Sequence, residues 1–378
     1  MVNLCFLLRG EKFLVNSRIV MLADLDYFFA QCEALRNPEL KTKPVVVGVY
    51  SGRTEDSGAV STANYIARQF GVNSGLPLHL ARKKLQNVAA VFLPVDFNYY
   101  KQISDKIMFF LRSYSDVFEQ VGIDEAYLDI SAKVNGNFKA GGVLAERIKT
   151  EVKKKVGISF SVGIGPNKLI AKIASEINKP DGLTVVEPQN VTSFLEPFSV
   201  HRIPGVGKKT KERMNTMGIT TIGDLAKYDI QRLCESFGRT FGIYFHNSAN
   251  GVNNDLVHKA VKSESISRMS TLRKNTRDLA VLIDKTDQLI FSIHKDLLNA
   301  HLNFKRVGLT VIMADLSIRS KSKTLLTSSD NISLLQKNVK FLLESFLSES
   351  KKEIRRIGVK ISQLSAKEEN QKKLSAFF

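Results

Sequence analysis

Blocks of apolar residues separated by polar ones run through residues 19–186. Continuous apolar runs without alternation predict strands that are buried on both faces. Such strands are expected at residues 19–22, 44–50, 158–165 and 183–186. Residues 117–130 instead suggest two strands around a tight turn. Because a hairpin pairs its strands antiparallel, the sheet is predicted to be mixed rather than purely parallel.

Helical spacing of apolar positions fills the gaps between these strands. The predicted helices cover residues 28–37, 62–71, 79–86, 98–113 and 166–180. Several of them end at an Asn-Pro, Gly or Lys-Pro signal, which cannot continue a helix. Residues 51–60 are polar and predict a loop.

The pattern changes at about residue 187. Short helices are expected up to about residue 250, followed by a polar linker at 251–264. The next segments are predicted, in order, as strand 265–271, helix 277–300, strands 306–318 and 321–327, helix 331–348 and strand 355–362. This order predicts a compact four-stranded sheet with two helices. Residues 363–378 are charged and largely aperiodic, which is typical of a flexible tail.

The net charge of the chain indicates which class of molecule it binds. The 378 residues are 43% apolar and carry a formal charge of +18, which indicates binding to a polyanion. No run of 18 apolar residues exists, so no membrane span is predicted and nucleic acid is the better partner. Residues 1–184 hold 24 basic and 18 acidic residues, whereas residues 185–378 hold 31 and 19. We therefore expect chemistry in the first half and the grip on a polyanion in the second.

The cysteines argue against two kinds of site. Cys5, Cys32 and Cys234 are odd in number and scattered, which disfavours both a disulfide framework and a structural zinc site. The chain is accordingly predicted to be intracellular and cytoplasmic. Residues 1–18 lack the basic start of a secretion signal, and we assign them no role.

Three carboxylates stand at the predicted ends of strands. Asp24 follows the first apolar run, and Asp124 and Glu125 are adjacent in the turn of the hairpin. Neighbouring like charges in a half-buried turn are costly unless a cation compensates them. Mg²⁺ takes oxygen ligands, and two such ions suit an in-line phosphoryl displacement. Spacing alone leaves open that these are ordinary turn acids facing water.

Four motifs resemble those of one enzyme family. They are ADLDYFFAQCE (23–33), SGRTEDSGAVSTANYIARQFG (51–71), GIDEAYLDIS (122–131) and SVGIGPNKLIAKIASEINKPDG (161–182). In this order they resemble the Y-family translesion DNA polymerases, and among these the DinB-like, archaeal-type DNA polymerase IV. The resemblance spans about residues 19–362 and includes the tail.

The resemblance implies an α+β multidomain, right-hand polymerase. It implies a mixed-sheet palm, small fingers, a helical thumb and a four-stranded, two-helix little finger. The expected parts are an extension (1–18), palm (19–28 and 96–186), fingers (29–95), thumb (187–250), linker (251–264), little finger (265–362) and tail (363–378).

The resemblance also assigns the carboxylates. Asp24, Asp124 and Glu125 would bind two Mg²⁺ ions, with Mn²⁺ as a substitute, and the carbonyl of Leu25 would complete one shell. Asp26 and Asp129 are not expected to bind metal, and Asp26 is expected to favour the positive end of the following helix. No side chain is an obvious general base, which is acceptable because a metal can lower the pKa of a primer 3′-hydroxyl.

A nucleotide pocket is expected beside these acids. Thr62, Tyr65 and Arg68 recur at three-residue steps, so the predicted helix would present two hydroxyls and a guanidinium on one face. Such a face suits a triphosphate, although it is also common on solvated helices. Lys179 would add a point charge to the same phosphates.

The resemblance adds further residues around the nucleotide. Tyr27 and Phe28 are expected to contact it, and Ala59 to lie over the templating base, where a small residue leaves room for lesions. Phe29 occupies the place of an aromatic steric gate against the ribose 2′-hydroxyl. Without the resemblance, Phe29 would be predicted as plain core.

Two regions are predicted to hold DNA. Gly205, Val206, Gly207 and Lys208 form the turn of a helix-hairpin-helix pattern, whose free N–H groups can bind a phosphate, although a plain helix-capping turn would look alike. Residues 261–360 carry 19 basic and 10 acidic residues, and alternation in 355–360 predicts one basic and one apolar sheet face. The candidate phosphate contacts are Arg268, Arg273, Lys274, Arg355 and Arg356, each of which could equally be solvated surface charge.

The tail carries one more motif. Gln371, Leu374, Phe377 and Phe378 resemble a sliding-clamp binding box. An exposed terminal Phe pair favours docking in an apolar groove, and the alternative is a terminus folded back on its own domain.

The expected function is template-directed addition of dNTPs to a primer 3′-hydroxyl by two-metal-ion catalysis. Low fidelity, no proofreading and synthesis past damaged template bases are expected from the resemblance. The expected partners are primer–template DNA, dNTPs and a sliding clamp, with the chain a monomer. The alternatives are a palm-fold nucleotidyl cyclase, whose glycine-pair signature is missing, a non-catalytic DNA-binding factor, and a template-restricted dCMP transferase.

Overall fold

A mixed five-stranded sheet forms the centre of the first half of the chain. The computed structural model describes residues 18–258 and 264–367. The strand order is β5-β6-β1-β7-β8. The bounds are Val117–Gln120 (β5), Glu125–Asp129 (β6), Val20–Leu25 (β1), Phe160–Gly165 (β7) and Leu183–Val185 (β8). Only the β7–β8 pair of this sheet is parallel, which confirms the predicted mixed sheet.

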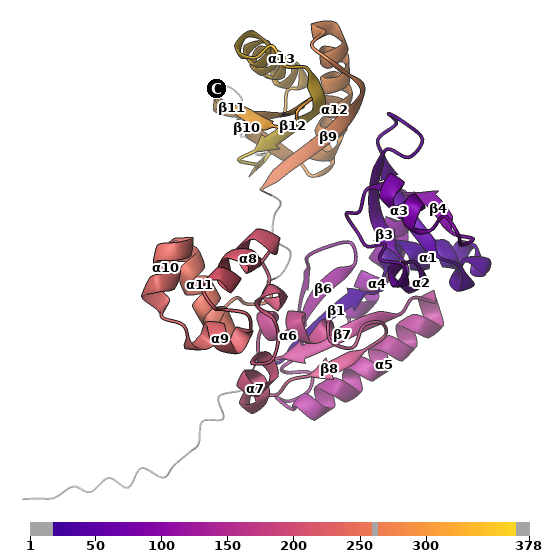
Figure 1. Ribbon diagram of the computed structural model, residues 1–378, viewed down its shortest axis with the longest axis vertical. Coiled ribbons are helices and arrows are strands. Elements are labelled where there is room, and N and C mark those ends of the chain that lie inside the picture. The colour runs from indigo at the N-terminus through magenta and orange to yellow at the C-terminus, as the bar shows by residue number, and fades with distance from the viewer. Residues whose placement is uncertain (1–17, 259–263, 368–378) are drawn as a thin grey trace, which may run out of the picture.

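Helices cover both faces of this palm sheet. α4 (Phe97–Arg112) and α5 (Phe138–Val156) pack on one face, and α6 (Lys168–Ser175) packs on the other (Figure 1). All residues of β1 are buried, because Met21 and Ala23 face the larger core while Val20 and Leu22 face α6. The helix predicted over residues 166–180 is shorter in the structure, where α6 ends at Ser175.

The fingers hold a second, three-stranded sheet in the order β3-β2-β4. Its elements and their neighbours are α1 (Phe28–Arg36), η1 (Pro38–Thr42), β2 (Val45–Tyr50), β3 (Gly58–Ala63), α2 (Tyr65–Gln69), α3 (Leu78–Lys84) and β4 (Val91–Pro94). The prediction of a loop at 51–60 and a helix from 62 was wrong, because β3 extends to Ala63. Small residues such as Gly58 and Ala59 have little strand preference, and pairing with β2 supplies the missing stabilisation.

Short helices follow, as predicted. They are η2 (Pro188–Asn190), α7 (Val191–Leu195), η3 (Val200–Arg202), α8 (Lys208–Thr216), α9 (Ile222–Lys227), α10 (Ile230–Phe237) and α11 (Arg239–Ala249). Met214, Leu233 and Phe245 are buried in a core that joins these helices to α6. Thr221 and Asp224 form a reciprocal capping box that fixes the start of α9.

The little finger is an antiparallel sheet covered by helices on one face only. Its elements are β9 (Ser265–Thr276), α12 (Leu279–Asn299), β10 (Leu302–Met313), β11 (Ile318–Ser329), α13 (Ile332–Glu349), β12 (Ile354–Ser362) and β13 (Ser365–Ala366). The order β11-β10-β12-β9 confirms the predicted four strands and two helices, and β13 adds a short pair with β10. Val307, Leu309 and Val311 are buried against α12 and α13, so the alternate residues form an open face.

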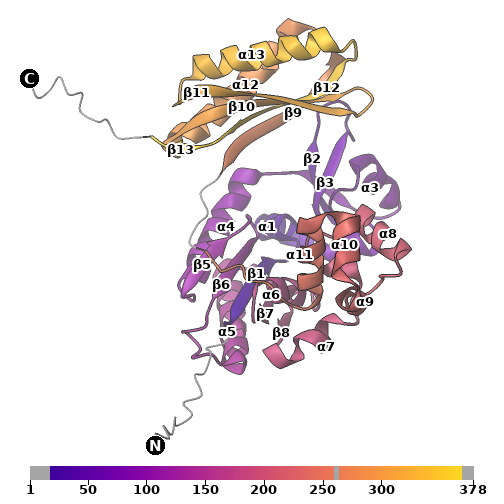
Figure 2. The same ribbon diagram turned by 90° about the vertical axis from the view of Figure 1, so that its left-hand side faces the viewer.

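The little finger lies beside the fingers and the palm. Figure 2 shows α12 and α13 on the far side of its sheet, so that the open face is turned toward the rest of the molecule. Arg53 of the fingers donates to Asn275 of β9 at 2.8 Å. The backbone N–H of His258 donates to Glu119 of the palm at 2.9 Å. None of the helices in residues 18–258 and 264–367 is long and apolar enough to cross a membrane.

Candidate active site

The three predicted metal ligands gather at one end of the palm sheet. Asp24 on β1 pairs in register with Glu125 on β6, so both side chains project from the face that α6 covers. Asp124 immediately precedes β6, and its carbonyl accepts a hydrogen bond of 2.8 Å from the N–H of Leu25. Antiparallel pairing thus brings together acids that are about 100 residues apart in the sequence.

Two lysines already neutralise part of this cluster. Lys172 on α6 places its Nζ 3.0 Å from Asp24 Oδ2 and 3.0 Å from Glu125 Oε1. Lys179 places its Nζ 2.7 Å from Asp24 Oδ1 and 2.9 Å from Glu176 Oε1. Both oxygens of Asp24 therefore contact an ammonium group. Sequence reasoning missed Lys172, although Lys168, Lys172 and Glu176 recur at four-residue steps and so mark a charged face of the predicted helix.

Burial and mutual repulsion make it costly for these acids to carry negative charge without a cation beside them. Burial raises the pKa of Asp124, and the charge of Asp24 raises it further. Burial also raises the pKa of Glu125, and the nearby Lys172 opposes that shift. For Lys172 itself, burial acts to lower the pKa, but Asp24 and Glu125 outweigh it and the net shift is upward. A cation beside these carboxylates would offset the cost of burying their charge.

The donor set fits a hard divalent cation. Carboxylate and carbonyl oxygens are what Mg²⁺ and its relatives prefer, and Asp24, Asp124 and Glu125 bring carboxylate oxygens to this end of the sheet. Within the described residues, no three acidic, histidine or cysteine side chains already stand at metal-binding spacing. The ammonium groups of Lys172 and Lys179 lie against the carboxylate oxygens that a cation would need.

Asp26 has a structural role that differs from the predicted one. Its carboxylate accepts hydrogen bonds from Ser161 Oγ at 2.9 and 3.1 Å and from the N–H of Asp181 at 2.7 Å. α1 has no acidic residue in its first turn, and Tyr27, in the left-handed region at φ 37°, precedes it. The expectation that Asp26 favours the start of this helix was therefore wrong: Asp26 is buried and joins β1 to β7 and to Asp181. Asp129 lies opposite Val20, at the far end of β1 from Asp24.

A polar cavity of about 220 Å³ opens beside the acids. Its lining residues are Asp24, Leu25, Asp26, Tyr27, Phe28, Ser61, Thr62, Tyr65, Arg68, Ser74, Asp124 and Lys179. Thr62 does not share a helix face with Tyr65 and Arg68, because it lies in β3 and the helix begins only at Tyr65. The three still meet in one cavity, since the strand turns directly into the helix. Ser61 and Ser74 are lining hydroxyls that sequence reasoning missed.

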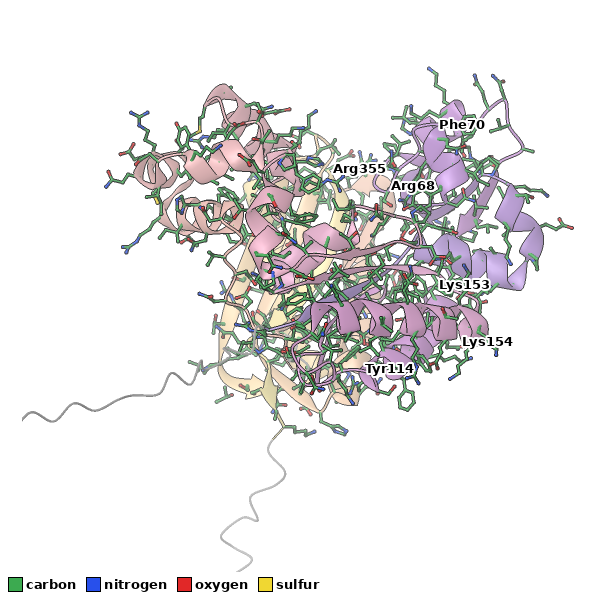
Figure 3. The ribbon with its side chains drawn as sticks, turned by 90° about the horizontal axis from the view of Figure 1, so that it is seen from below. Arg68, Phe70, Tyr114, Lys153, Lys154 and Arg355 are labelled. Carbon is green, nitrogen blue, oxygen red and sulfur yellow. The ribbon has the colours of Figure 1, made fainter. Side chains whose placement is uncertain are left out.

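Local contacts hold the cationic wall of this cavity. Arg68 donates from Nε to the carbonyl of Ala63 at 2.9 Å, and its guanidinium lies 4.7 Å from the ring centroid of Tyr65. Tyr65 in turn meets Tyr27 edge-on, with ring centroids 5.3 Å apart. Figure 3 shows Arg68 in the fingers nearer to the palm than Phe70. Among residues 18–258 and 264–367 the guanidinium has no acidic partner, which leaves its charge for a ligand.

The two phenylalanines and Ala59 have different surroundings. Phe28 is buried in the core and also borders the cavity. Phe29 stacks on Tyr100 with centroids 4.5 Å apart, and the Tyr100 hydroxyl donates to Glu33 Oε1 at 2.6 Å. Neither Phe29 nor Ala59 is among the residues that line the cavity, and Ala59 is exposed on β3.

The predicted hairpin turn of the thumb has the expected shape. Gly205 adopts φ +86°, and Gly207 is the residue before α8, which starts at Lys208. Only glycine takes such a φ without strain. Lys208 is exposed, with 90% of its side chain accessible. A crevice of about 420 Å³ separates this turn from Lys172 and Glu176 of the palm.

The basic residues of the little finger divide between its two faces. Directly paired residues on neighbouring strands face the same side. Arg268 pairs with the buried Val359, so it faces the helices, where it forms a salt bridge with Asp296 of α12. Arg356 pairs with Ile312 on the open face, and its Nε is buried without a partner.

Other predicted contacts lie at irregular points of the sheet. Arg355 is the extra residue where the pairing of β10 with β12 shifts, and it is labelled in Figure 3. Arg273 and Lys274 are exposed where β9 loses register with β12. Sequence reasoning missed Arg306, which lies along the open face and donates to Ser322 Oγ at 2.8 Å from its Nη2. The candidate clamp residues Gln371, Leu374, Phe377 and Phe378 lie outside the described residues.

Comparison with known families agrees with this geometry. Residues 23–176 match the impB/mucB/samB family, residues 201–253 match the thumb domain of DNA polymerase-iota, and residues 263–375 match the impB/mucB/samB C-terminal domain. DNA polymerase IV of Nitrosopumilus maritimus is 44% identical over 365 residues, covering 96% of this chain and 100% of the relative. This chain belongs to the Y-family DNA polymerases.

Further relatives and solved structures support the same family. DNA polymerase IV of Saccharolobus solfataricus is 37% identical, covering 95% of this chain and 99% of the relative. The Y-family polymerase chimera Dbh-Dpo4(243-245)-Dbh superposes with a TM-score of 0.86 at 37% identity, covering 92% of this chain and 99% of the chimera. The insertion ternary complex of Dbh DNA polymerase gives 0.66 at 36% identity, with the same 92% and 99% coverage.

The predicted family, fold class and enzyme class are thereby confirmed. The chain is a DNA-directed DNA polymerase of the DNA polymerase IV group, with the α+β multidomain architecture of its family. The cyclase and the non-catalytic binding factor are set aside as alternatives. Membership in this family also implies dependence on a divalent metal ion.

Proposed function

We propose that this polymerase adds dNTPs to a primer 3′-hydroxyl with two divalent cations, preferably Mg²⁺ with Mn²⁺ as a substitute. Asp24, Asp124 and Glu125 would hold the cations, and the carbonyl of Leu25 would complete one shell. When bound, the cations would lower the pKa of the attacking hydroxyl and stabilise the leaving pyrophosphate. The observation that supports this most is the in-register pair of Asp24 and Glu125, together with the lining of one polar cavity by Asp24 and Asp124.

The cavity wall provides for the triphosphate. Arg68 offers a guanidinium that no acid neutralises among its described contacts, and Thr62 and Tyr65 offer hydroxyls from the same side. Lys179 stands at the border between this wall and the acids. The residues thus bind and orient the phosphates, while the acids of the palm hold the cations at the reacting end.

Tolerance of damaged template bases belongs to the same proposal. The strand of the fingers nearest the cavity carries Gly58, Ala59 and Ser61, whose small side chains would leave space above a templating base. The open face of the little finger offers basic side chains that would contact the DNA backbone and read no sequence. Together these features favour low-fidelity synthesis past lesions without proofreading.

Primer extension tests the core of this proposal. A labelled primer on a DNA template would be extended with all four dNTPs and Mg²⁺ by the wild type, by Asp124→Ala and by Asp105→Ala. Asp105 lies on the exposed side of α4, paired with Lys101 and away from the cavity, so its variant should match the wild type. We expect Asp124→Ala to lose extension and keep duplex binding. Full extension by Asp124→Ala would refute the assignment of the ligands.

Two further assays define the range of the activity. A panel with one dNTP at a time separates general synthesis from a transferase restricted to dCMP, since only the former uses every template base. Misincorporation rates on a defined template test the expected low fidelity.

The tail is proposed to bind a sliding clamp. The residues that would bind it are Gln371, Leu374, Phe377 and Phe378, because of their spacing and because the last three are apolar. Removing residues 371–378 should abolish clamp-stimulated synthesis and spare synthesis without the clamp. Equal stimulation of the full and shortened chains would refute this role.

A further inference from the structure

Two ammonium groups lie against the acids where cations are needed. The acidic side chains at this end of the palm are Asp24, Asp124, Glu125 and Glu176, and the lysines among them are Lys172 and Lys179. Asp24 contacts one lysine through each of its oxygens. Each oxygen of Asp24 thus already has one positively charged partner, as it would if the carboxylate were shared by two cations.

Lys172 is the better placed of the two to respond to cations. Its Nζ lies 3.0 Å from a carboxylate oxygen of Asp24 and 3.0 Å from one of Glu125. These two residues are paired across β1 and β6. Glu176, one turn further along α6, lies 3.7 Å from the same Nζ. Lys172 also borders the crevice toward the thumb. The side chain therefore has a third acid, Glu176, and an open space to move to when it leaves Asp24 and Glu125.

We propose that Lys172 is an internal counterion that holds Asp24 and Glu125 in place and that a divalent cation must displace it to bind. Lys172 is a positioning residue in this role, because it acts through the carboxylates. It keeps two like charges side by side in the protein without metal, and it lowers the affinity for the first cation. The inference rests on the proposed metal site at Asp24, Asp124 and Glu125.

The geometry gives the direction of the effect. A cation and Lys172 compete for the same oxygens of Asp24 and Glu125, so removing the ammonium removes the competitor. Removing one positive charge also deepens the negative potential at the cluster. Both consequences tighten cation binding. A lysine that contacted none of these oxygens would not compete for them.

The helix provides a matched control. Lys168 lies one turn before Lys172 on α6 and pairs with Glu119 at 2.8 and 2.9 Å. Lys168 is thus a partly buried, ion-paired lysine on the same helix that contacts none of the proposed ligands. Lys168→Met removes the same charge and chain atoms at a different acid.

Mn²⁺ binding to the full chain, without DNA or nucleotide, tests the proposal. Electron paramagnetic resonance of free Mn²⁺ would give dissociation constants for the wild type, Lys172→Met, Lys172→Arg and Lys168→Met. We expect Lys172→Met to bind Mn²⁺ at least about fivefold more tightly than the wild type. Lys172→Arg keeps the charge and should bind no more tightly than the wild type, and Lys168→Met should stay within about twofold.

The outcomes separate this proposal from the one on which it rests. If Asp124→Ala binds Mn²⁺ as the wild type does, the metal site is misassigned and both proposals fail. If Asp124→Ala loses Mn²⁺ but Lys172→Met binds it no more tightly than Lys168→Met, only the counterion role is overturned.

A measurement on the unaltered protein covers the case in which Lys172→Met does not fold. Lysine labelled with ¹³C at Cε would be followed by NMR during a Mg²⁺ titration, with the Lys172 signal assigned from its loss in Lys172→Arg. We expect the Lys172 signal to move as Mg²⁺ is added while that of Lys168 stays. A Lys172 signal that stays fixed while Mg²⁺ binds would overturn the proposal.

Discussion

The palm sheet and the little-finger sheet are built from strands of opposite character. β1 of the palm is buried along its whole length, because α4 and α5 cover one face and α6 covers the other. β10 of the little finger alternates between buried and accessible residues, because helices cover only one of its faces. A sheet that is buried on both faces supports few polar groups, because removing them from water costs free energy. A sheet with one open face can carry polar groups there at little cost, because they stay in contact with water.

The difference explains what each region can do with charge. The acids of the palm stand at the edge of a buried sheet, so burial raises the pKa of Asp124 and Glu125 and cations are needed to compensate them. Arg306 lies instead on an accessible face, where its guanidinium can meet a phosphate, and Arg356 lies on the same face with its Nε buried. The palm gathers acidic side chains at one site, where cations can bind. The little finger distributes basic side chains over an open face, where they can contact phosphates.

The largest effect should come from the palm. Asp24→Ala removes the carboxylate that contacts both Lys172 and Lys179. We expect primer extension to fall by at least about 100-fold, because a preorganised charge at the reacting centre is lost. Duplex affinity, measured by fluorescence anisotropy, should change little. A variant that extends normally would show that the acids of the palm have no part in the reaction.

A smaller effect should come from Phe29. Its ring stacks on Tyr100 and does not line the cavity, and its role as a gate against the ribose 2′-hydroxyl is proposed from the family resemblance. If the ring is that gate, Phe29→Ala would free the space that the 2′-hydroxyl needs. We expect the preference for dNTPs over NTPs, measured in single turnovers, to fall by about tenfold or more. Phe29→Tyr keeps the ring and serves as the control. An unchanged preference in Phe29→Ala would contradict the role of a steric gate.

Substitutions on the open face of the little finger should change DNA affinity and leave turnover almost unchanged. The double variant Arg306→Ala, Arg356→Ala removes two charges from the open face. The slope of log affinity against log salt should become shallower by about 1–2, while turnover on saturating DNA stays near that of the wild type. Arg268→Ala is the matched control, because Arg268 faces the helices and pairs with Asp296. Equal losses in both variants would mean that the two faces do not differ as described.

The smallest effect concerns Asp26 and pH. Burial raises the pKa of Asp26 above its ordinary value of 3.8. A buried acid with a raised pKa binds its proton more tightly when folded, so the wild type should lose stability as pH rises from about 4 through that raised pKa. Asp26→Asn lacks this loss, and its thermal unfolding temperature should vary less with pH over the same window. Identical pH profiles would show that Asp26 is not buried as a charged group.

A control variant separates charge from hydrogen bonding at this position. Asp26→Ala leaves Ser161 Oγ and the N–H of Asp181 without their acceptor. We expect it to lower the free energy of unfolding by about 1–3 kcal/mol. Asp26→Asn retains an acceptor and should cost less.

The sequence by itself determined the elements whose residues carry their own signal. The continuous apolar run at residues 19–22 and the alternation in the little finger predicted sheets of different burial, and both were found. The four motifs predicted the family, since their order and length leave little room for chance. Cap and turn residues such as Gly205 specify their conformation locally, so the hairpin of the thumb was predictable as well.

Tertiary structure decided what depends on partners distant in the chain. β3 is a strand because β2 supplies its hydrogen bonds, although Gly58 and Ala59 by themselves disfavour one. Asp26 serves β7 and Asp181 instead of its own helix because folding brings Ser161 within hydrogen-bonding distance. Lys172 became a partner of Asp24 and Glu125 only when α6 packed across their strands. A local pattern fixes the backbone conformation, whereas the partner of a charged side chain is set by the packing of segments that meet only in the folded chain.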